Sequence, residues 1–217
     1  MLRKAFQSVA RSLWTLSTMG LDSGDHIVRY DMYRRMRRQI EGHSLGCRVL
    51  SISHSSRLAM LLGARPEDIT EANYPEHNLC NLALPDNGYS AVVSDQVFEH
   101  ISCDPQRAVN EVHRILAPGG IAVHTTCFLT PYHGSTDMHD VANGDYWRYT
   151  PSGLALLHAG YSRVIAADGW GNPFMILLNF LGVNRMPVPQ AEWHPLNKLA
   201  RMNSGSHHYV VWVIAQK

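Results

Sequence analysis

The stretch NLALPDNGYSAVVSDQVFEHI, residues 81–101, carries the clearest fold signal in the chain. Its Pro85 to Gly88 segment has the composition of a tight turn, because proline, aspartate, asparagine and glycine all suit turn backbone. The run that follows, Ser90 to Asp95, is short and apolar, as expected of a buried strand. This stretch therefore predicts a turn that leads into a core strand.

Short apolar runs alternate with helical patterns on both sides of this strand. Further strands are expected at residues 48–53, 68–72, 120–126, 162–167 and 208–215, with an extended stretch at 78–82. Helices are expected at residues 27–41, 56–63, 105–116 and 151–159. Such alternation is typical of βαβ units, and it predicts an α/β fold with a mainly parallel sheet.

The length of 217 residues fits one domain with additions at its edges. We expect a helical extension over residues 1–47 and an α/β core over 48–169. A helical insertion over 170–207 and a last strand over 208–217 complete this organisation of residues 1–217.

The composition excludes several classes of protein. Lysine and arginine number 19 against 18 acidic residues, so no general nucleic-acid partner is expected. The four cysteines are widely spaced, which argues against a zinc knuckle or a disulfide framework and favours a reducing, cytoplasmic location. No apolar run approaches the ~20 residues that a transmembrane helix needs.

The helical extension has two basic parts. Residues 1–21 carry Arg3, Lys4 and Arg11 without an acid, and their apolar residues recur at helical spacing. This pattern predicts a helix that packs on the domain or on a second subunit, with a targeting or membrane-surface helix as the alternative. If the helix packs on a second subunit, the chain could form a homodimer through these helices or through the apolar 173–183 helix. Residues 27–41 are rich in arginine, which indicates a solvated helix face or an anion-binding patch.

The quoted stretch, followed by Asp104-Pro105 and by RILAPGG at residues 114–120, resembles the middle of the class I S-adenosylmethionine-dependent methyltransferases. The segment DYWRYTPSGL, residues 145–154, is similar to a subgroup associated with glycan or small-molecule biosynthesis. The resemblance, to the methyltransferase type 11 kind, implies a Rossmann-like fold. It also implies a seven-stranded sheet with helices on both faces and a final antiparallel strand.

The resemblance also implies S-adenosylmethionine as cofactor and indicates where it would bind. The family's first motif is an acid followed by alternating glycines, whereas this chain reads SISHSSR at residues 51–57. Serine leaves some room for the cofactor and Ser55 or Ser56 can cap the next helix, but His54 and Arg57 must point away. The predicted cofactor residues are Ser51, Ser53, Ser55, Glu71 for the ribose, Asn78 and Leu79 for adenine, and Asp95 and Gln96 for the methionine end.

The catalytic and acceptor residues are expected after the fourth and fifth core strands. His100 and His133 are the predicted catalytic residues, because histidine titrates near neutrality and can take a proton from a hydroxyl. Asp145, Tyr146, Trp147 and Arg148 suit a polyhydroxylated or anionic acceptor, or else tie their loop to the next helix. The loop at residues 131–140 also holds Asp137, His139 and Asp140, but their spacing fixes no ligand geometry, and we predict no metal site.

These residues support two hypotheses of function. The first is methyl transfer to oxygen, less readily to nitrogen, of a sugar or other small biosynthetic intermediate. The second is a catalytically inactive methyltransferase-like scaffold that has lost normal cofactor binding, as the altered motif at residues 51–57 indicates. A nucleic-acid modifier has only the arginine cluster before residue 48 in its support.

Overall fold

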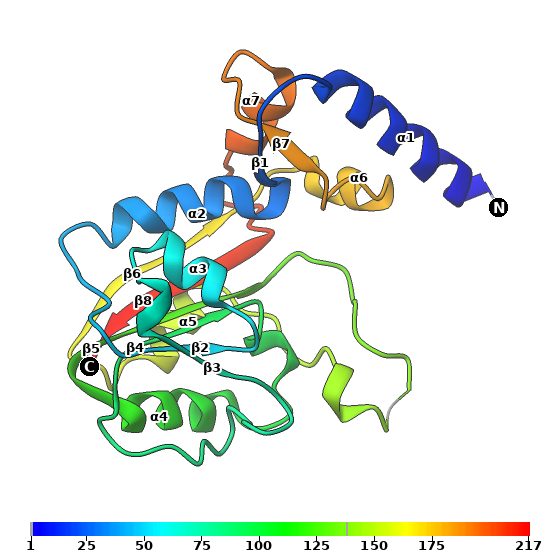
Figure 1. Cartoon of the computed structure of the whole chain (residues 1–217). Helices are drawn as coiled ribbons and strands as arrows, with labels where there is room; N and C mark the ends of the chain where they lie inside the picture. The colour runs from blue at the N-terminus through cyan, green and yellow to red at the C-terminus, as the bar shows by residue number, and fades with distance from the viewer. Residues whose placement is uncertain (1, 138) are drawn as a thin grey trace. The chain divides into compact units, whose positions relative to one another are not determined.

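The computed structural model describes residues 2–137 and 139–217 of the predicted 1–217 domain. Met1 and Met138, the second of which belongs to the 131–140 loop, lie outside the described residues. The chain divides into two compact units, which are coloured by residue number in Figure 1. The helical unit comprises residues 1–35 and 170–210, and the sheet unit comprises residues 36–169 and 211–217.

The sheet unit is built on a six-stranded sheet with the order β3-β2-β4-β5-β8-β6. Its strands are β2 (Val49–Ile52), β3 (Ile69–Ala72), β4 (Tyr89–Asp95), β5 (Leu116–Cys127), β6 (Arg163–Trp170) and β8 (Val210–Gln216). The pairs β2–β3, β2–β4 and β4–β5 are parallel, and Figure 1 shows β8 running opposite to β6. The Rossmann-like fold class with a reversed last strand is thereby confirmed.

The expected seventh strand does not form in the described residues. The stretch at residues 78–82 makes only an isolated bridge between Asn78 and Asn81. A strand here would have to cross over from the end of β3 at Ala72 and return parallel to it, which takes a dozen or more residues. The chain offers five before Asn78, so the segment turns instead, and β3 is the edge of the sheet.

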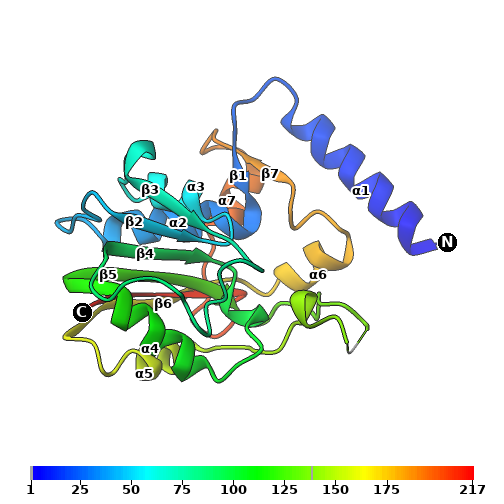
Figure 2. The same ribbon diagram turned by 60° about the horizontal axis from the view of Figure 1, so that its bottom comes forward.

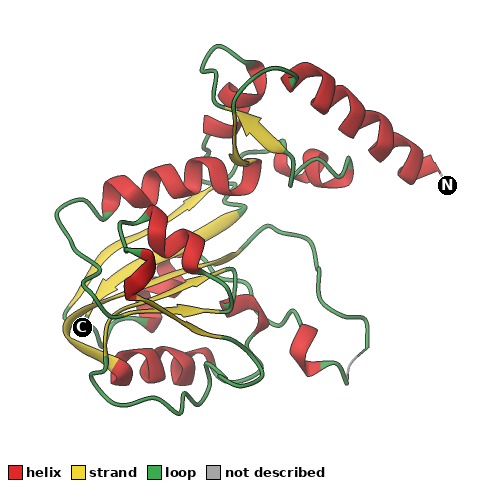
Figure 3. Cartoon of the chain, in the orientation of Figure 1, coloured by secondary structure: helices red, strands yellow, loops and turns green. Residues whose placement is uncertain are grey.

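Helices cover the two faces of this sheet. Figure 2 shows α4 (Pro105–Ile115) and α5 (Pro151–Leu157) on one side and α3 (Ser56–Leu61) on the other. Helix α4 begins at Pro105 because proline suits the first turn and Asp104 accepts a hydrogen bond from the Gln106 backbone N–H. Short 3-10 helices lie at Pro66–Asp68, Phe98–His100 and Val141–Asn143, and most of the segment between β5 and α5 is loop (Figure 3).

The helical unit joins the predicted extension to the predicted insertion. It contains α1 (Leu2–Thr18), most of α2 (Ile27–Gln39), α6 (Met175–Phe180), α7 (Pro195–Arg201), and an antiparallel pair of β1 (Ser23–His26) and β7 (Pro187–Pro189). The buried Trp14 of α1 donates from Nε1 to the Pro187 carbonyl, which fastens α1 to the insertion. The domain boundaries predicted at residues 48, 170 and 208 stay predictions.

None of the helices in the described residues has the length and apolar character that crossing a membrane requires.

Candidate functional site

A small cavity lies at the edge of the sheet unit where β2 and β4 end. Its volume is about 100 Å³, and four predicted site residues line it: Ser53, Asn78, Leu79 and His100. The lining also includes residues that the sequence did not single out, namely Ile52, Tyr74, His77, Val97, Ile101, Ser102 and Val141. Ligand sites for whole small molecules usually measure ~300–1,000 Å³, so this cavity suits one end of a cofactor.

The turn after β2 keeps a glycine-like backbone without glycine. Ser53 has φ +52° and His54 has φ +62°, both in the left-handed region that glycine enters freely. The Ser53 N–H donates to the Ala72 carbonyl, and the His54 N–H donates to Asn73 Oδ1. These bonds to the end of β3 hold the turn in the conformation that alternating glycines would otherwise favour.

The hydroxyls of Ser51 and Ser55 do not line the cavity. Ser55 does not cap α3 with its side chain, so that expectation is wrong. Its Oγ donates to the Ile52 carbonyl and accepts from the Asp95 N–H at 2.8 Å, which ties the end of β2 to the end of β4. Ser51 Oγ is buried and has no hydrogen-bond partner among the described residues. His54 and Arg57 are exposed and do not line the cavity, as cofactor entry requires.

The predicted ribose and adenine residues lie at different places. Glu71 is exposed at the end of β3, in register with Ser51, and it does not line the cavity. Asn78 lines the cavity, but its Oδ1 already accepts a hydrogen bond from the Cys80 N–H. Leu79 is buried in the same wall and offers an apolar surface.

Asp95 and Gln96 form a hydrogen-bond network at the end of β4. Thr125 Oγ1 donates to Asp95 Oδ1 at 2.6 Å, and the Gln96 side chain donates to the same hydroxyl oxygen at 3.1 Å. Cys127 Sγ donates to Gln96 Oε1, and Gln96 has φ +60°. The contact of either residue with the methionine end of a cofactor stays a prediction.

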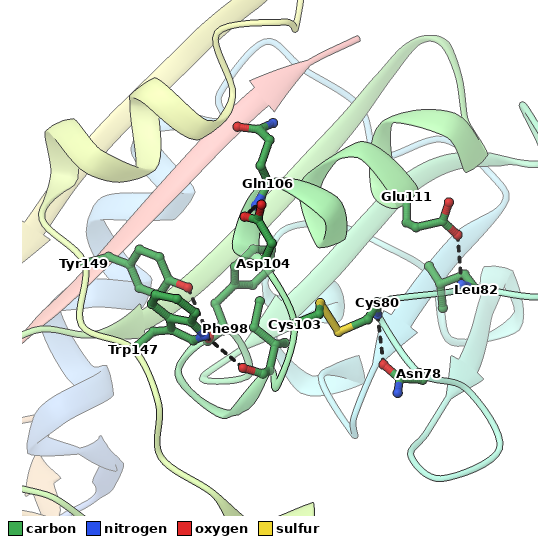
Figure 4. Close-up of a disulfide and its surroundings, with 11 residues drawn as sticks. Asn78, Cys80, Leu82, Phe98, Cys103, Asp104, Gln106, Glu111, Trp147 and Tyr149 are labelled. Atoms are coloured by element: carbon green, nitrogen blue, oxygen red, sulfur yellow. Dashed lines mark hydrogen bonds between the residues drawn. A yellow bond between two sulfur atoms is a disulfide. The ribbon is translucent and has the colours of Figure 1, made fainter. Parts of the chain in front are cut away.

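A disulfide braces the cavity wall (Figure 4). Cys80 and Cys103, 23 residues apart, are bonded, and they follow directly the cavity-lining segments 78–79 and 100–102. The wide cysteine spacing argued against a disulfide framework, and that expectation is wrong for this pair, which meets only through the fold. The disulfide counts against a strongly reducing compartment, and the cytoplasmic location stays a prediction.

The two predicted catalytic histidines lie together. The ring centroids of His100 and His133 are 5.1 Å apart, although the residues are 33 positions apart in the sequence. His100 Nδ1 is 2.6 Å from the Gly144 carbonyl, and His133 Nδ1 lies 3.3 Å from Asp145 Oδ2 and 3.1 Å from the Pro131 carbonyl. Each Nδ1–H is thus directed at an oxygen, which leaves each Nε2 as the free nitrogen.

Asp145 is held in place from two sides. Both terminal nitrogens of Arg148 donate hydrogen bonds to its carboxylate, and the His133 backbone N–H donates to Oδ2 at 3.0 Å. Burial acts to raise the pKa of Asp145, but the hydrogen bonds from Arg148 and the His133 backbone lower it below its usual value. Asp145 is therefore a fixed carboxylate beside the His133 ring, whereas direct contact with an acceptor stays a prediction.

Tyr146 and Trp147 expose part of their rings beside this pair. Their backbone N–H groups both donate to the Glu99 carbonyl, and Trp147 Nε1 donates to the Ile101 carbonyl at 2.9 Å. Glu99 itself is fully buried and accepts hydrogen bonds from Thr126 and Cys127. The predicted acceptor segment is thus tied to the segment after β4, and its aromatic rings remain available.

Two groups of residues bring possible metal-ligand atoms within 4.8 Å of one another: Glu99, Cys127 and His133, and His100, His133 and Asp145. Arg148 already neutralises the Asp145 carboxylate. Burial raises the pKa of the Cys127 thiol, and a protonated thiol is a poor ligand. These donors suit a hydrogen-bond network better than a cation, and the absence of a metal site stays a prediction.

Residues 32–124 match the protein-family model of a methyltransferase domain. The fold is similar to a crystal structure of an S-adenosylmethionine-dependent methyltransferase from Mesorhizobium loti, at 13% identity, TM-score 0.50, and coverage of 88% of this chain and 98% of that one. It is also similar to Haemonchus contortus phosphoethanolamine N-methyltransferase 2 in complex with S-adenosyl-L-methionine, at 14% identity, TM-score 0.52, and coverage of 87% and 52%.

A third similar structure is the [4+2]-cyclase SpnF, at 14% identity, TM-score 0.51, and coverage of 100% of this chain and 94% of that one. Among curated proteins, none matches this sequence. At such identities the solved structures establish the fold alone, and a fold can host several reactions.

The sheet order, the cavity at the strand ends and the match over residues 32–124 together define the class. The chain is a Rossmann-like α/β protein that contains a methyltransferase domain. Its residues 32–124 carry the methyltransferase match, in agreement with the resemblance that the sequence indicated.

Proposed function

We propose that the sheet unit binds S-adenosylmethionine and directs its methyl group to a hydroxyl oxygen of a small, sugar-like acceptor. The observation that carries this proposal is the His133–Asp145 pair beside His100, at the edge of the sheet where ligands bind in this fold. When bound, S-adenosylmethionine supplies an electrophilic methyl carbon on sulfonium.

The turn after β2 supports cofactor binding despite its sequence. Its backbone adopts positive φ at Ser53 and His54, so it follows the path of a glycine-rich loop. Ser53 lines the cavity, whereas the larger side chains of His54 and Arg57 do not. We place the adenine end of the cofactor in the cavity against Leu79 and Asn78, and Glu71 near the ribose.

The histidine pair supports transfer to oxygen. A hydroxyl becomes a stronger nucleophile when a base takes its proton, and the base must lie within hydrogen-bond reach. With its Nδ1–H directed at the Pro131 carbonyl, His133 presents Nε2 as the acceptor of that proton, and the Asp145 carboxylate, 3.3 Å from Nδ1, stabilises the resulting imidazolium. His100 lies 5.1 Å away and can orient the acceptor.

The exposed rings of Tyr146 and Trp147 support a sugar-like acceptor. Aromatic faces next to polar groups suit ligands that have apolar ring faces and polar edges. Both rings lie in the segment that carries Asp145, so an acceptor stacked on them would be near the base.

The test is the release of S-adenosylhomocysteine from S-adenosylmethionine with a panel of sugars and nucleotide sugars, and of amines for comparison. We expect turnover with a hydroxylated acceptor, its loss in His133→Gln, and its retention in His139→Gln. His139 is an exposed histidine of the same loop outside the histidine pair, so it is a matched control. Equal turnover in both variants would show that His133 is not the base.

The alternative is an inactive scaffold, which the loss of the motif's acid and glycines at residues 51–57 favours. It predicts no binding of S-adenosylmethionine or S-adenosylhomocysteine. Cofactor binding without turnover on any acceptor would leave a cofactor-binding protein and would refute the catalytic part of the proposal.

A further inference from the structure

Helix α1 presents an apolar stripe that the protein leaves uncovered. Four of its large apolar side chains recur at helical spacing and are between 59% and 63% exposed: Phe6, Val9, Leu13 and Leu16. The inward side of the helix is fixed differently, since Trp14 is buried and donates to Pro187. The stripe is therefore not the face by which α1 packs on its own unit.

Helix α6 lies beside α1 and adds further exposed apolar side chains (Figures 1 and 2). Gln7 donates to the Phe180 carbonyl, and Arg11 donates to the Gly182 carbonyl at 3.0 Å. Four side chains of this segment are 47% to 61% exposed: Phe174, Ile176, Leu177 and Phe180. Two neighbouring helices of the helical unit thus expose apolar residues, whereas monomeric proteins rarely expose large contiguous apolar patches.

The charge of these two segments has one sign. Residues 1–21 contain no acid and carry Arg3, Lys4 and Arg11, while residues 169–191 contain no acid and carry Arg185. An amphipathic helix with exposed apolar residues and only basic charges fits the interface of an anionic lipid bilayer. In a symmetric contact between two copies, the same positive charges would face each other and repel.

We propose that α1 and α6 form a peripheral binding surface for anionic membranes. The apolar side chains enter the boundary between headgroups and acyl chains, and the basic side chains contact lipid phosphates. This binding uses none of the cofactor or catalytic residues, so it stands apart from methyl transfer. It would hold the chain at a lipid surface without a membrane-spanning helix.

The test is co-sedimentation of the full chain with vesicles of phosphatidylcholine, with and without about one third phosphatidylglycerol. We expect binding to the anionic vesicles that weakens at high salt, because salt screens the basic charges. The double variant Leu13→Gln with Leu16→Gln should bind on the order of tenfold more weakly, since two exposed leucines no longer enter the bilayer. The matched control is Ser8→Gln, an exposed position of the same helix outside the stripe.

Circular dichroism of each variant checks that the fold is intact. Binding that is equal in the double variant and the Ser8 control would overturn the proposal, as would equal binding to neutral and anionic vesicles. So would the absence of sedimentation with any vesicle. A concentration-dependent dimer that the double variant abolishes, without vesicle binding, would also overturn it and assign the surface to a second copy of the chain.

Discussion

The turn after β2 and the histidine pair after β4 and β5 differ in what their sequences reveal. The turn lacks every glycine of the family's motif, yet its backbone takes positive φ at Ser53 and His54. The pair has no recognisable spacing, yet the fold brings His100 and His133 to 5.1 Å and sets Asp145 behind His133. An altered motif can thus keep a left-handed backbone, and side chains that share no motif can lie together in the fold.

The largest effect is expected at the histidine pair. His133→Gln should lower kcat by about 10²–10⁴ because a positioned base is lost. The measurement is S-adenosylhomocysteine release on whichever acceptor the wild type methylates. Affinity for S-adenosylhomocysteine should stay unchanged, and a drop in that affinity equal to the drop in rate would move His133 to the cofactor site.

The second effect concerns the disulfide that joins the cavity walls. Cys80→Ser should lower the free energy of unfolding by about 3 kcal/mol, because the unfolded chain loses a cross-link over 23 positions. Urea unfolding with and without dithiothreitol measures it. Cys47→Ser, a change at an exposed free cysteine, should have little effect. If the reductant destabilises wild type and Cys80→Ser equally, the bond does not brace this wall.

The third effect is the loss of folding stability in acid, to which the buried His158 contributes. His158 is buried with its Nδ1–H directed at the Leu154 carbonyl, and burial lowers its pKa to about 4. As pH falls below about 6.5, His158 takes up a proton in the unfolded chain but not in the native chain. The free energy of unfolding therefore falls until pH reaches about 4. His158→Phe should flatten this loss, which amounts to about 1–3 kcal/mol for wild type. Thermal melts at pH 7, 5.5 and 4.5 measure it, and parallel curves for the two proteins would exclude His158 as the cause.

The smallest effect tests the strain in the turn. His54→Gly should raise the free energy of unfolding by about 0.5–1 kcal/mol, because glycine accepts φ +62° although it also makes the unfolded chain freer. His54→Ala is the matched control, since it removes the imidazole but keeps Cβ. Equal stability of the two variants would mean that the left-handed turn is not strained.

The sequence predicted the elements whose apolar pattern is strong. Strand β4 and helix α4 begin and end within about one residue of the prediction, because buried faces fix their periodicity. The strand expected at residues 78–82 failed because the pattern ignores how much chain a crossover needs. The β1–β7 pair was missed because SGDH has no β-forming residue and PVP has a single valine between two prolines.

The sequence predicted which types of residue form the candidate site, but not which groups their side chains contact. Histidine chemistry singled out His100 and His133, while the contact between Asp145 and His133 spans 12 positions. The hydroxyl of Ser55 is equally suited to a helix cap and to its observed link between β2 and β4. Side-chain partners of this kind depend on tertiary packing, which no local pattern encodes.

The central claim is that the altered turn still admits the cofactor to the cavity at the strand ends. Calorimetric titration of the full chain with S-adenosylhomocysteine tests it most directly. The account predicts saturable binding with a Kd below about 1 mM, weakened at least roughly tenfold by Ser102→Trp, which fills the cavity from its exposed rim. The absence of binding to the wild type at millimolar concentration, or an unchanged Kd in Ser102→Trp, would contradict it.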